Sequence, residues 1–541
     1  RGNAEEAESE DRPARPAVAV FQAPVFTEPM FQTPERAAAA AAAEAHDHEQ
    51  VAAHLRSLLG LMPDANPQQR ISGLLELGEQ ELLCADLVRA RRTFGEAAET
   101  ARSSGDQTGL ARAALGFAGG DVGFGWESSG GDPAALALLQ EALAVLGDGE
   151  PRLALRMIFR LAYLSVITGD HEEMSSLVER ADELGRRLGD PEAQVLARST
   201  ELVSLFRRSP DPLRVLDQWE DCLGLVDPGR ECGREELLFR VVQTTAASHY
   251  IAGRMAECER AIAWAGEIAD RLGSPRFGWE VDLNRGMRLL DRGDRERGEA
   301  LVRRAGSVVR RLRPDIQMQV ETTALLSAEW VYGGETATSR LSYEAFLRVN
   351  PTGFVPAFIA MAAALEGDRE TAQESLRAQL VDDCASLRGP DAYFPMGLWA
   401  LAYTAAHLGD REAGARLRPM FEPLRSHIVA AAPGVGFGHL PEWHIGRLEL
   451  LAGRFDAAIA ELQAAVARAQ ELEIVWAEAL ARIDLARALH HRGDAEGAAA
   501  ALAEGEAVAR RFRVGWALRK RCISLCPCAA SKTRIVTSFS P

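Results

Sequence analysis

Apolar stretches along the chain are separated by short polar breaks, many of which contain a glycine followed by Asp or Arg. These glycines are Gly169, Gly253, Gly293, Gly367, Gly409, Gly453 and Gly493. They are separated by 84, 40, 74, 42, 44 and 40 residues, so the two wide gaps are close to twice the others. About forty residues hold two helices and two turns, and such a period is typical of a helical-repeat solenoid. We expect further turns at Ser209-Pro210 and Gly333-Gly334, inside the wide gaps.

The residues that follow a turn glycine also repeat in size. A small residue stands at the fifth position, a large one at the ninth and a small one at the twelfth. After Gly453 these residues are Ala458, Leu462 and Ala465. Steps of four and three place them on one face of a helix. Small residues there let two helices approach closely, and the large one fills the space beside them.

The same size pattern follows several other turns. It is present after Gly253, Gly293, Gly493 and a turn at Ala85, partial after Gly169 and Gly367, and weak after Gly409, where Arg418 takes the large position. A turn glycine can end the first helix in the left-handed conformation, and the Asp that often follows can cap the second. Each period therefore predicts a hairpin of two antiparallel helices.

This pattern resembles the tetratricopeptide repeat, whose further glycine, seven residues before the turn, has counterparts at Gly286 and Gly446. The repeats exceed that family's usual length of about 34 residues. They are similar to the helical region of large bacterial ATP-dependent regulators of the LuxR and maltose-activator types and of cyclase-linked ATPases. The stretches that carry this similarity are 87–115, 138–162 and 183–191, and the resemblance extends over roughly residues 40 to 515.

Composition agrees with helices throughout. Aromatic residues make up 6% of the 541 residues, and Ala, Leu, Arg and Glu dominate the long runs. We predict an all-α, tetratricopeptide-like helical-hairpin solenoid, a right-handed superhelix, over residues 37–515. Residues 1–36 form a Pro-rich arm that we expect to be disordered, although its two Phe-Gln-x-Pro boxes could dock on a partner. Residues 516–541 form an atypical basic, Cys-containing tail.

Charge and cysteine usage restrict the partners and the compartment. The formal net charge of -17 disfavours nucleic-acid binding, which needs a basic surface. Cysteines are scattered singly through the body, which indicates reduced thiols. No apolar run reaches the roughly 18 residues of a membrane span, and no signal pattern opens the chain. We expect a cytoplasmic protein with no membrane partner, and the start at Arg1 suggests a fragment of a longer protein.

The tail differs from the body in its residue types. It carries Cys522, Cys526 and Cys528 with five basic residues and no acidic one. Three thiols could bind a metal, but a structural zinc site takes four ligands. A shifted reading frame at the end of the gene is the alternative, and the third-base GC content of codons on either side of Trp516 tests it.

The sequence contains no recognisable catalytic motif. Lysine occurs only at Lys520 and Lys532, so the Gly-x-x-x-x-Gly-Lys phosphate loop of the ATPase domains in the regulators it resembles has no counterpart. Neither a Gly-x-Ser-x-Gly elbow nor a His-Glu-x-x-His helix occurs. The helix-turn-helix of LuxR-type members cannot be assigned to any residue. We predict no enzyme, no catalytic residue, no cofactor and no metal.

Three other groups of residues could carry ligands or simply support the fold. The tryptophans at 264, 279, 330, 399, 443 and 476 fit repeat-core packing better than an aromatic ligand cage. The glycine-rich stretches 119–131 and 433–438 follow no predicted strand and fit inter-repeat loops better than anion cradles. We expect His46, His48 and His54 to be solvated, and His490 and His491 to lie in a helix's last turn.

The predicted function is a non-enzymatic protein-interaction or sensor scaffold in bacterial signalling, which binds a protein, peptide or small effector in the solenoid groove. The alternative is the sensor region of an ATP-dependent LuxR-type transcriptional regulator or cyclase-linked ATPase, whose other domains lie outside this chain. The residues assigned to repeat turns and packing are Gly253, Gly293, Gly453, Gly493, Ala458, Leu462 and Ala465.

Overall fold

The computed structural model describes residues 47–61, 65–122, 132–165, 171–208, 221–225, 235–312, 328, 331–332, 344, 354–381, 394–425, 427–430, 438–515 and 517. The predicted arm and nearly all of the predicted tail lie outside these residues. So do the expected turns at Gly169, Ser209-Pro210 and Gly333-Gly334.

Helices follow one another in hairpins. The first helices are α3 (Pro67–Leu83), α5 (Gln107–Phe117), α7 (Pro151–Ser165), α9 (Pro191–Arg208), α11 (Glu235–Ile251), α13 (Pro275–Asp291), α17 (Phe354–Glu366), α19 (Phe394–Leu408), α21 (Pro441–Leu451) and α23 (Val475–Arg492). The second helices are α4 (Leu87–Ser104), α6 (Pro133–Leu146), α8 (His171–Leu188), α12 (Met255–Leu272), α14 (Arg295–Leu312), α18 (Arg369–Gln379), α20 (Arg411–Leu417), α22 (Phe455–Glu471) and α24 (Ala495–Arg511). Helix α2 (His48–Leu61) precedes them, and a 3-10 helix, η5 (Arg418–Leu424), follows α20.

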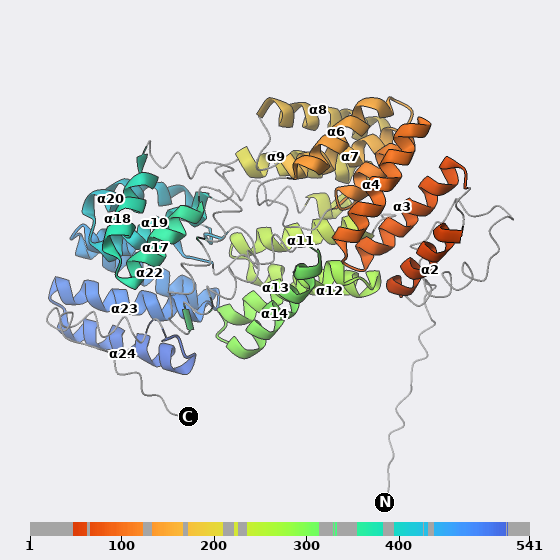
Figure 1. Ribbon diagram of the computed structural model, residues 1–541. Helices are drawn as coiled ribbons and strands as arrows, with labels where there is room; N and C mark the ends of the chain where they lie inside the picture. The colour runs from red at the N-terminus through yellow and green to blue at the C-terminus, as the bar shows by residue number, and fades with distance from the viewer. Residues whose placement is uncertain are drawn as a thin grey trace, which may run out of the picture.

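From α2 to α9, from α11 to α14 and from α17 to α24, each helix packs against the next along the chain. The described residues contain no strand, only one isolated antiparallel bridge between Val429 and His439. The predicted all-α, tetratricopeptide-like helical-hairpin solenoid is confirmed. Its hairpins extend from one side of the molecule, through α11 to α14 in the middle, to α17 to α24 on the other side (Figure 1).

At a hairpin turn, a glycine ends the first helix and the aspartate after it begins the second. Gly493 has φ +94°, and its N–H donates to the carbonyl of His490 at 3.0 Å, which ends α23. Asp494 then accepts a hydrogen bond from the Gly497 N–H at 2.8 Å, which begins α24. Positive φ is also found at Gly253, Gly293 and Gly453. The left-handed conformation is inexpensive for glycine, because glycine has no Cβ.

Close packing within a hairpin is visible between α21 and α22. Ala458, Leu462 and Ala465 are all fully buried on α22. Opposite them lies Gly446 of α21, where an added Cβ would stand 2.6 Å from Leu462 Cγ. The two helices therefore approach so closely that a methyl group between them would force a shift.

The repeat that begins at Gly409 departs from the rest. Helix α20 ends at Leu417, and η5 contains Pro419 and Pro423, which cannot donate helical hydrogen bonds. Arg418 pairs with Glu449 at 2.8 Å instead of filling the core. We call residues 427–430 and 438–440, which follow η5, the clip. The weak match to the size pattern thus coincides with the loss of a full second helix.

Segments far apart in the sequence lie side by side. Ser274 Oγ donates to the carbonyl of Leu83 at 2.6 Å, 191 positions away. Arg288 Nη2 lies 3.4 Å from the carbonyl of Leu472, 184 positions away. The segment from α11 to α14 therefore contacts both earlier and later repeats, in agreement with its central place in Figure 1.

The first helices in the central and C-terminal parts are buried almost along their whole length. In α13 Arg285 is the one exposed residue, and α11 and α21 have none. The second helices α12, α14, α22 and α24 keep an exposed polar face. Polar side chains on the first helices must therefore find partners inside the protein.

Candidate functional site: a buried polar and aromatic junction

Polar residues one repeat apart pair across neighbouring first helices. Arg240 of α11 binds Glu280 of α13 through two hydrogen bonds of 2.8 and 2.9 Å. One turn further along, Asn284 Nδ2 donates to Gln243 Oε1 at 2.8 Å. The paired residues are 40 and 41 positions apart, and all four are buried. The repeat period places them opposite each other.

Asp291 is the meeting point of three helices. Its Oδ2 accepts from the Tyr250 hydroxyl of α11 at 2.9 Å and from Arg288 Nη1 of α13 at 3.0 Å. Its Oδ1 accepts from Trp476 Nε1 of α23 at 3.4 Å. Complete burial raises the pKa of Asp291, and the charge of Arg288 and the hydrogen bonds oppose that rise.

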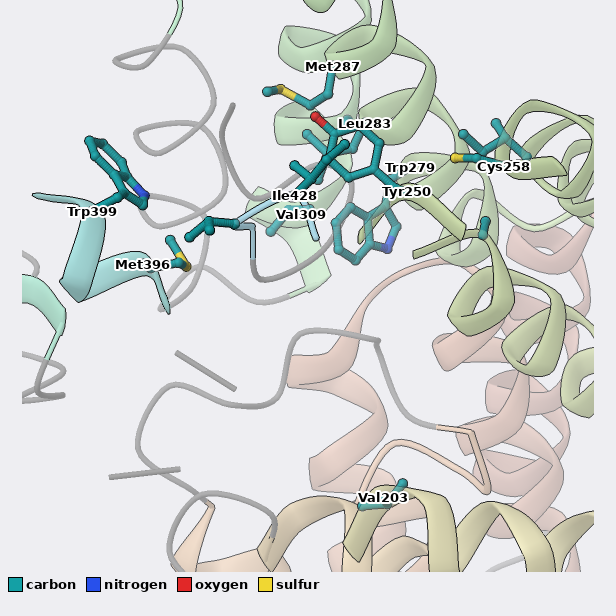
Figure 2. Packing of buried hydrophobic residues seen from close by; sticks show 14 of the residues in the cluster. Val203, Tyr250, Cys258, Trp279, Leu283, Met287, Val309, Met396, Trp399 and Ile428 are labelled. Atoms are coloured by element: carbon teal, nitrogen blue, oxygen red, sulfur yellow. The ribbon is translucent and has the colours of Figure 1, made fainter. Parts of the chain in front are cut away.

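The clip is bound to the end of α11. The Ile428 N–H donates to the carbonyl of Ile251 at 2.7 Å, and the Gly438 N–H donates to the Tyr250 hydroxyl at 3.2 Å. Figure 2 shows Ile428 with the buried Tyr250 and Trp279. Burial holds the pKa of Tyr250 well above its usual value, so the phenol stays protonated and can donate to Asp291. We call Tyr250, Arg288, Asp291, Gly438 and Trp476 the junction.

Aromatic rings surround the clip on the C-terminal side of the junction. The His439 ring stacks on Trp399, with ring centroids 3.6 Å apart and an interplanar angle of 16°. His439 Nδ1 lies 3.1 Å from His444 Nε2. Burial, with a further contribution from Arg447, holds the pKa of His439 well below its usual value. His439 is therefore neutral at pH 7 and packs as an aromatic ring.

A second aspartate repeats the arrangement of Asp291 in α23. Trp443 Nε1 donates to Asp484 Oδ2 at 2.9 Å, across 41 positions. Arg487 Nη1 donates to Asp484 Oδ1 at 3.0 Å, and Arg447 Nε lies 3.6 Å from Oδ2. An aromatic donor one repeat before a buried aspartate is thus common to both sites.

Ion pairs lie at the more exposed edge of the junction. Arg292 contacts Glu259 at 2.7 Å and Glu473 at 2.6 Å. Arg288 reaches the same Glu259 at 3.2 Å. The Arg292–Glu473 pair joins the turn after α13 to the turn before α23, but both of its side chains are exposed, so the pair is individually weak.

The four turn glycines assigned from the sequence occupy two different surroundings. A Cβ at Gly253 would lie 3.2 Å from Leu472, and one at Gly293 would clash with the Phe512 ring. A Cβ at Gly453 or Gly493 would meet no atom within 4 Å. Two of the glycines therefore also allow contact with a distant repeat, in addition to their role in the turn.

The tryptophans contribute both to the core and to the cluster around His439. Trp279, Trp399, Trp443 and Trp476 are buried, and Trp264 is partly buried against the core, as repeat packing predicts. Trp330 lies outside the described residues. The gathering of three of them around His439 has no counterpart in the sequence pattern.

Both glycine-rich loops supply contacts to the central helices. The carbonyl of Gly119 accepts a hydrogen bond from Arg276 of α13, 157 positions away. Gly438 binds Tyr250 of α11, 188 positions away. Much of each stretch, residues 123–131 of the first and 433–437 of the second, lies outside the described residues.

The expectation for His48 is wrong, because this side chain is buried and not solvated. Its Nδ1 lies 2.9 Å from Gln80 Oε1 of α3. His48 shares one helix face with Val51, Ala52 and Leu55, and this face packs on α3. His490 and His491 are exposed in the last turn of α23, and His46 lies outside the described residues.

The junction was not predicted from the sequence, although some of its residue pairs are spaced by one repeat period. Tyr250 and Asp291, Trp443 and Asp484, and Arg240 and Glu280 are each one period apart, so a search for polar or aromatic partners at that spacing would have found them. No such signal marks Trp476 as a partner of Asp291, 185 positions away.

The chemistry available at these sites is hydrogen bonding and ion pairing. Burial raises the pKa of Cys222 and of Cys258 to about 12 and that of Cys84 to about 11, so these thiols carry little thiolate. In the part of the chain that the structure describes, no three His, Cys, Asp or Glu side chains are grouped so as to hold a metal ion. Within that same part, every helix is too short or too polar to cross a membrane.

Comparison of the chain with known proteins gives weak matches to solved structures. No protein-family model matches it, and no curated protein does. Solved structures that match include the APC/C hetero-tetramer Cut9-Hcn1, at 14% identity over 90% of this chain and 89% of that chain, with a TM-score of 0.39. Yeast Tom70 matches at 12% identity over 91% and 96%, with a TM-score of 0.28. A circular tandem repeat protein matches at 18% identity over 90% and 97%, with a TM-score of 0.14. Identities and TM-scores this low do not establish that the chain shares a function with any of these proteins.

Proposed function

We propose that the chain is a non-enzymatic interaction or sensor scaffold that binds a protein, peptide or small effector in the groove of its solenoid. The observation that carries this proposal is Asp291, which accepts hydrogen bonds from α11, α13 and α23. It connects repeats that are far apart in the chain, so breaking this contact would change how those repeats lie against each other.

The physical argument rests on the polarity of the junction. A simple solenoid is held by contacts between neighbouring repeats. Here distant repeats are joined by hydrogen bonds to Tyr250 and Asp291, and Asp291 is buried with its ion-pair partner Arg288. Such buried polar groups are costly to desolvate and contribute less to stability than apolar packing of the same volume. Such contacts are directional and are either made or broken. A ligand that binds the open form better would shift the population toward it.

The cellular setting is part of the same proposal. The similarity of the repeats to those of large bacterial regulators supports a place in bacterial signalling. The singly spaced cysteines, of which Cys222 and Cys258 are free and buried, support a reducing, cytoplasmic location. The absence of catalytic motifs in the sequence supports binding over turnover.

Affinity capture with matched variants tests the proposal. The immobilised chain is incubated with native cell extract, and bound proteins are quantified by mass spectrometry. We expect a discrete set of proteins whose recovery changes several-fold for Asp291→Ala, in which the junction is weakened, but not for Arg303→Ala on the exposed face of α14. Recovery of no specific protein, together with tight retention of a small molecule, would overturn the protein-scaffold proposal and leave only the sensor.

The alternative proposal is a sensor region that belongs to an ATP-dependent LuxR-type regulator or a cyclase-linked ATPase. The similarity of residues 87–115 to those proteins supports it, and the structure places this stretch in α4 and α5. The reading frame upstream of Arg1 distinguishes the two proposals. A phosphate-loop domain in that frame would support the regulator proposal, and a start codon close to Arg1 would contradict that proposal.

A further inference from the structure

Arg447 is a buried cation whose hydrogen-bonding capacity is hardly used. Its side chain lies on α21 and is 7% exposed. The guanidinium carbon lies 4.2 Å from the centroid of the Tyr403 ring and 5.3 Å from that of Trp443. Its Nε lies 3.6 Å from Asp484 Oδ2, too far for a good hydrogen bond. Its Nη1 is buried and has no hydrogen-bond partner among the described residues.

The charges around Arg447 do not balance. Asp484 is the acidic residue beside it, and Asp484 already accepts a 3.0 Å hydrogen bond from Arg487. Glu449, two residues further along α21, is held by Arg418 and Arg454. Two guanidinium groups, the buried one of Arg447 and the partly exposed one of Arg487, therefore share one buried carboxylate. Burial lowers the pKa of Arg447, and the charge of Asp484 opposes this shift. Burial also lowers the pKa of His439, and Arg447 contributes to that shift.

Two other buried arginines of this protein each make two hydrogen bonds. Arg240 makes two hydrogen bonds to Glu280, and Arg160 donates through two nitrogens to the carbonyl of Ala118. A buried charged donor without an acceptor costs considerably more free energy than a buried neutral donor without one. Arg447 differs from Arg240 and Arg160 in this respect, and a missing acceptor accounts for the difference.

We infer that Arg447 binds a small, monoanionic carboxylate ligand with a flat apolar body, within the group formed by Arg447, Tyr403, Trp443 and Asp484. The planar guanidinium offers paired N–H donors that fit a carboxylate. One negative charge balances the excess of one positive charge, whereas a dianionic phosphate would leave a charge uncompensated. The two aromatic rings favour a planar body over a hydrated one. This inference rests on the proposed function, for which it names the ligand class.

Titration with simple anions provides the test. Sodium benzoate and sodium acetate are added to the full chain, with sodium phosphate and sodium chloride at equal ionic strength as comparisons, and binding is followed by calorimetry and by the melting temperature. We expect saturable binding of benzoate, weaker binding of acetate, and no saturable response to phosphate or chloride. Equal responses to all four salts would reveal an adventitious ion only and would overturn the inference.

Variants separate a ligand site from a structural ion pair. In Arg447→Met a buried, poorly paired charge is replaced by an apolar chain, so the ligand-free variant should be at least as stable as the original protein. It should also bind benzoate about ten-fold or more weakly, because a hydrogen bond to a charged group is lost. Arg447→Lys keeps the charge but loses the paired donors and should also weaken binding, whereas Arg303→Met should leave it unchanged.

Two further results would contradict the inference. If Arg447→Met fails to fold or melts well below the original protein, as we expect for Arg240→Met, then Arg447 is a structural residue. If Arg447→Met binds benzoate as tightly as the original protein, the anion binds elsewhere. Either result can occur with normal protein capture, in which case the interaction scaffold survives and only the carboxylate ligand is wrong.

Discussion

The Tyr250 hydroxyl donates a 2.9 Å hydrogen bond to Asp291, 41 positions further along the chain, and both residues are contacted by a third part of the protein. The Gly438 N–H donates to Tyr250, and Trp476 Nε1 donates to Asp291. Tyr250 and Asp291, which lie one repeat apart, thus each receive a further hydrogen bond from a residue about 185 positions away. The pair joins two neighbouring first helices and also links them to the C-terminal repeats.

Removing the Asp291 carboxylate should destabilise the protein strongly. Asp291→Ala leaves the buried Arg288 without its closest carboxylate, and Tyr250 and Trp476 without an acceptor. We expect a loss of about 3 to 5 kcal/mol, the usual cost of breaking a buried pair on one side. Urea denaturation followed by circular dichroism measures it.

Asp456→Ala is the control for that loss. Asp456 also pairs with an arginine, Arg492 at 3.5 Å, but its side chain is 88% exposed. The control should change stability by less than about 1 kcal/mol. Similar denaturation curves for the two variants would show that the junction contributes no more than a surface pair.

Stability should fall on acidification, in part because of His439. Its pKa in the folded protein lies well below 6.5, whereas in the unfolded chain it is near 6.5. The folded state therefore binds fewer protons than the unfolded one below about pH 6.5. Its contribution is fully present above that pH and is lost as the pH falls, by up to about 1.4 kcal/mol per pH unit.

His439→Gln should flatten this dependence between pH 7 and pH 5, because glutamine does not titrate. Melting curves over that range compare the slopes, so the lost ring stacking on Trp399 does not interfere. The exposed His491 serves as the control, and His491→Gln should keep the original slope. An unchanged slope in His439→Gln would mean that His439 is not the neutral, buried group described above.

A single methyl group should disturb the contact between α21 and α22. Gly446→Ala places a Cβ 2.6 Å from Leu462 Cγ, and overpacking of this kind costs about 1 to 3 kcal/mol. Gly278→Ala in α13 meets no atom within 4 Å and should be neutral or stabilising by up to about 1 kcal/mol. Thermal melts of both variants compare them, and equal melting temperatures would contradict the close approach of the helices.

The buried thiols should react slowly with alkylating reagents. At pH 8 a pKa of about 12 leaves roughly one Cys258 in ten thousand as thiolate. Iodoacetamide labelling of the native protein, mapped by mass spectrometry, should modify Cys258 and Cys222 far more slowly than after denaturation in urea. Rapid labelling of Cys258 in the native protein would show that its surroundings open readily.

Local features of the fold follow from the sequence because their causes are local. The turn at Gly493 can be predicted from a glycine that tolerates positive φ and an aspartate that caps the next helix. The burial of Ala458, Leu462 and Ala465 follows from their spacing on one helix face. The pairing of Tyr250 with Asp291 could also have been found, since one repeat period separates them.

Arg418 shows where such reasoning stops. Its place in the size pattern predicts a weak repeat, and Pro419 and Pro423 indicate that the helix ends there. Nothing in the sequence says that the chain continues as a clip bound to Ile251. His48 shows the same limit at the other end, because its burial depends on how α2 lies on α3.

The sequence by itself determined the hairpins, their period and the residues at their turns, since each depends on contacts between residues at most one repeat apart. Only the tertiary structure decided that distant repeats meet, that Asp291 binds Trp476, and that Arg447 is buried with too few partners. The physical reason is that small rotations between successive hairpins add up along the solenoid. Their sum, which no single repeat encodes, determines which surfaces come into contact.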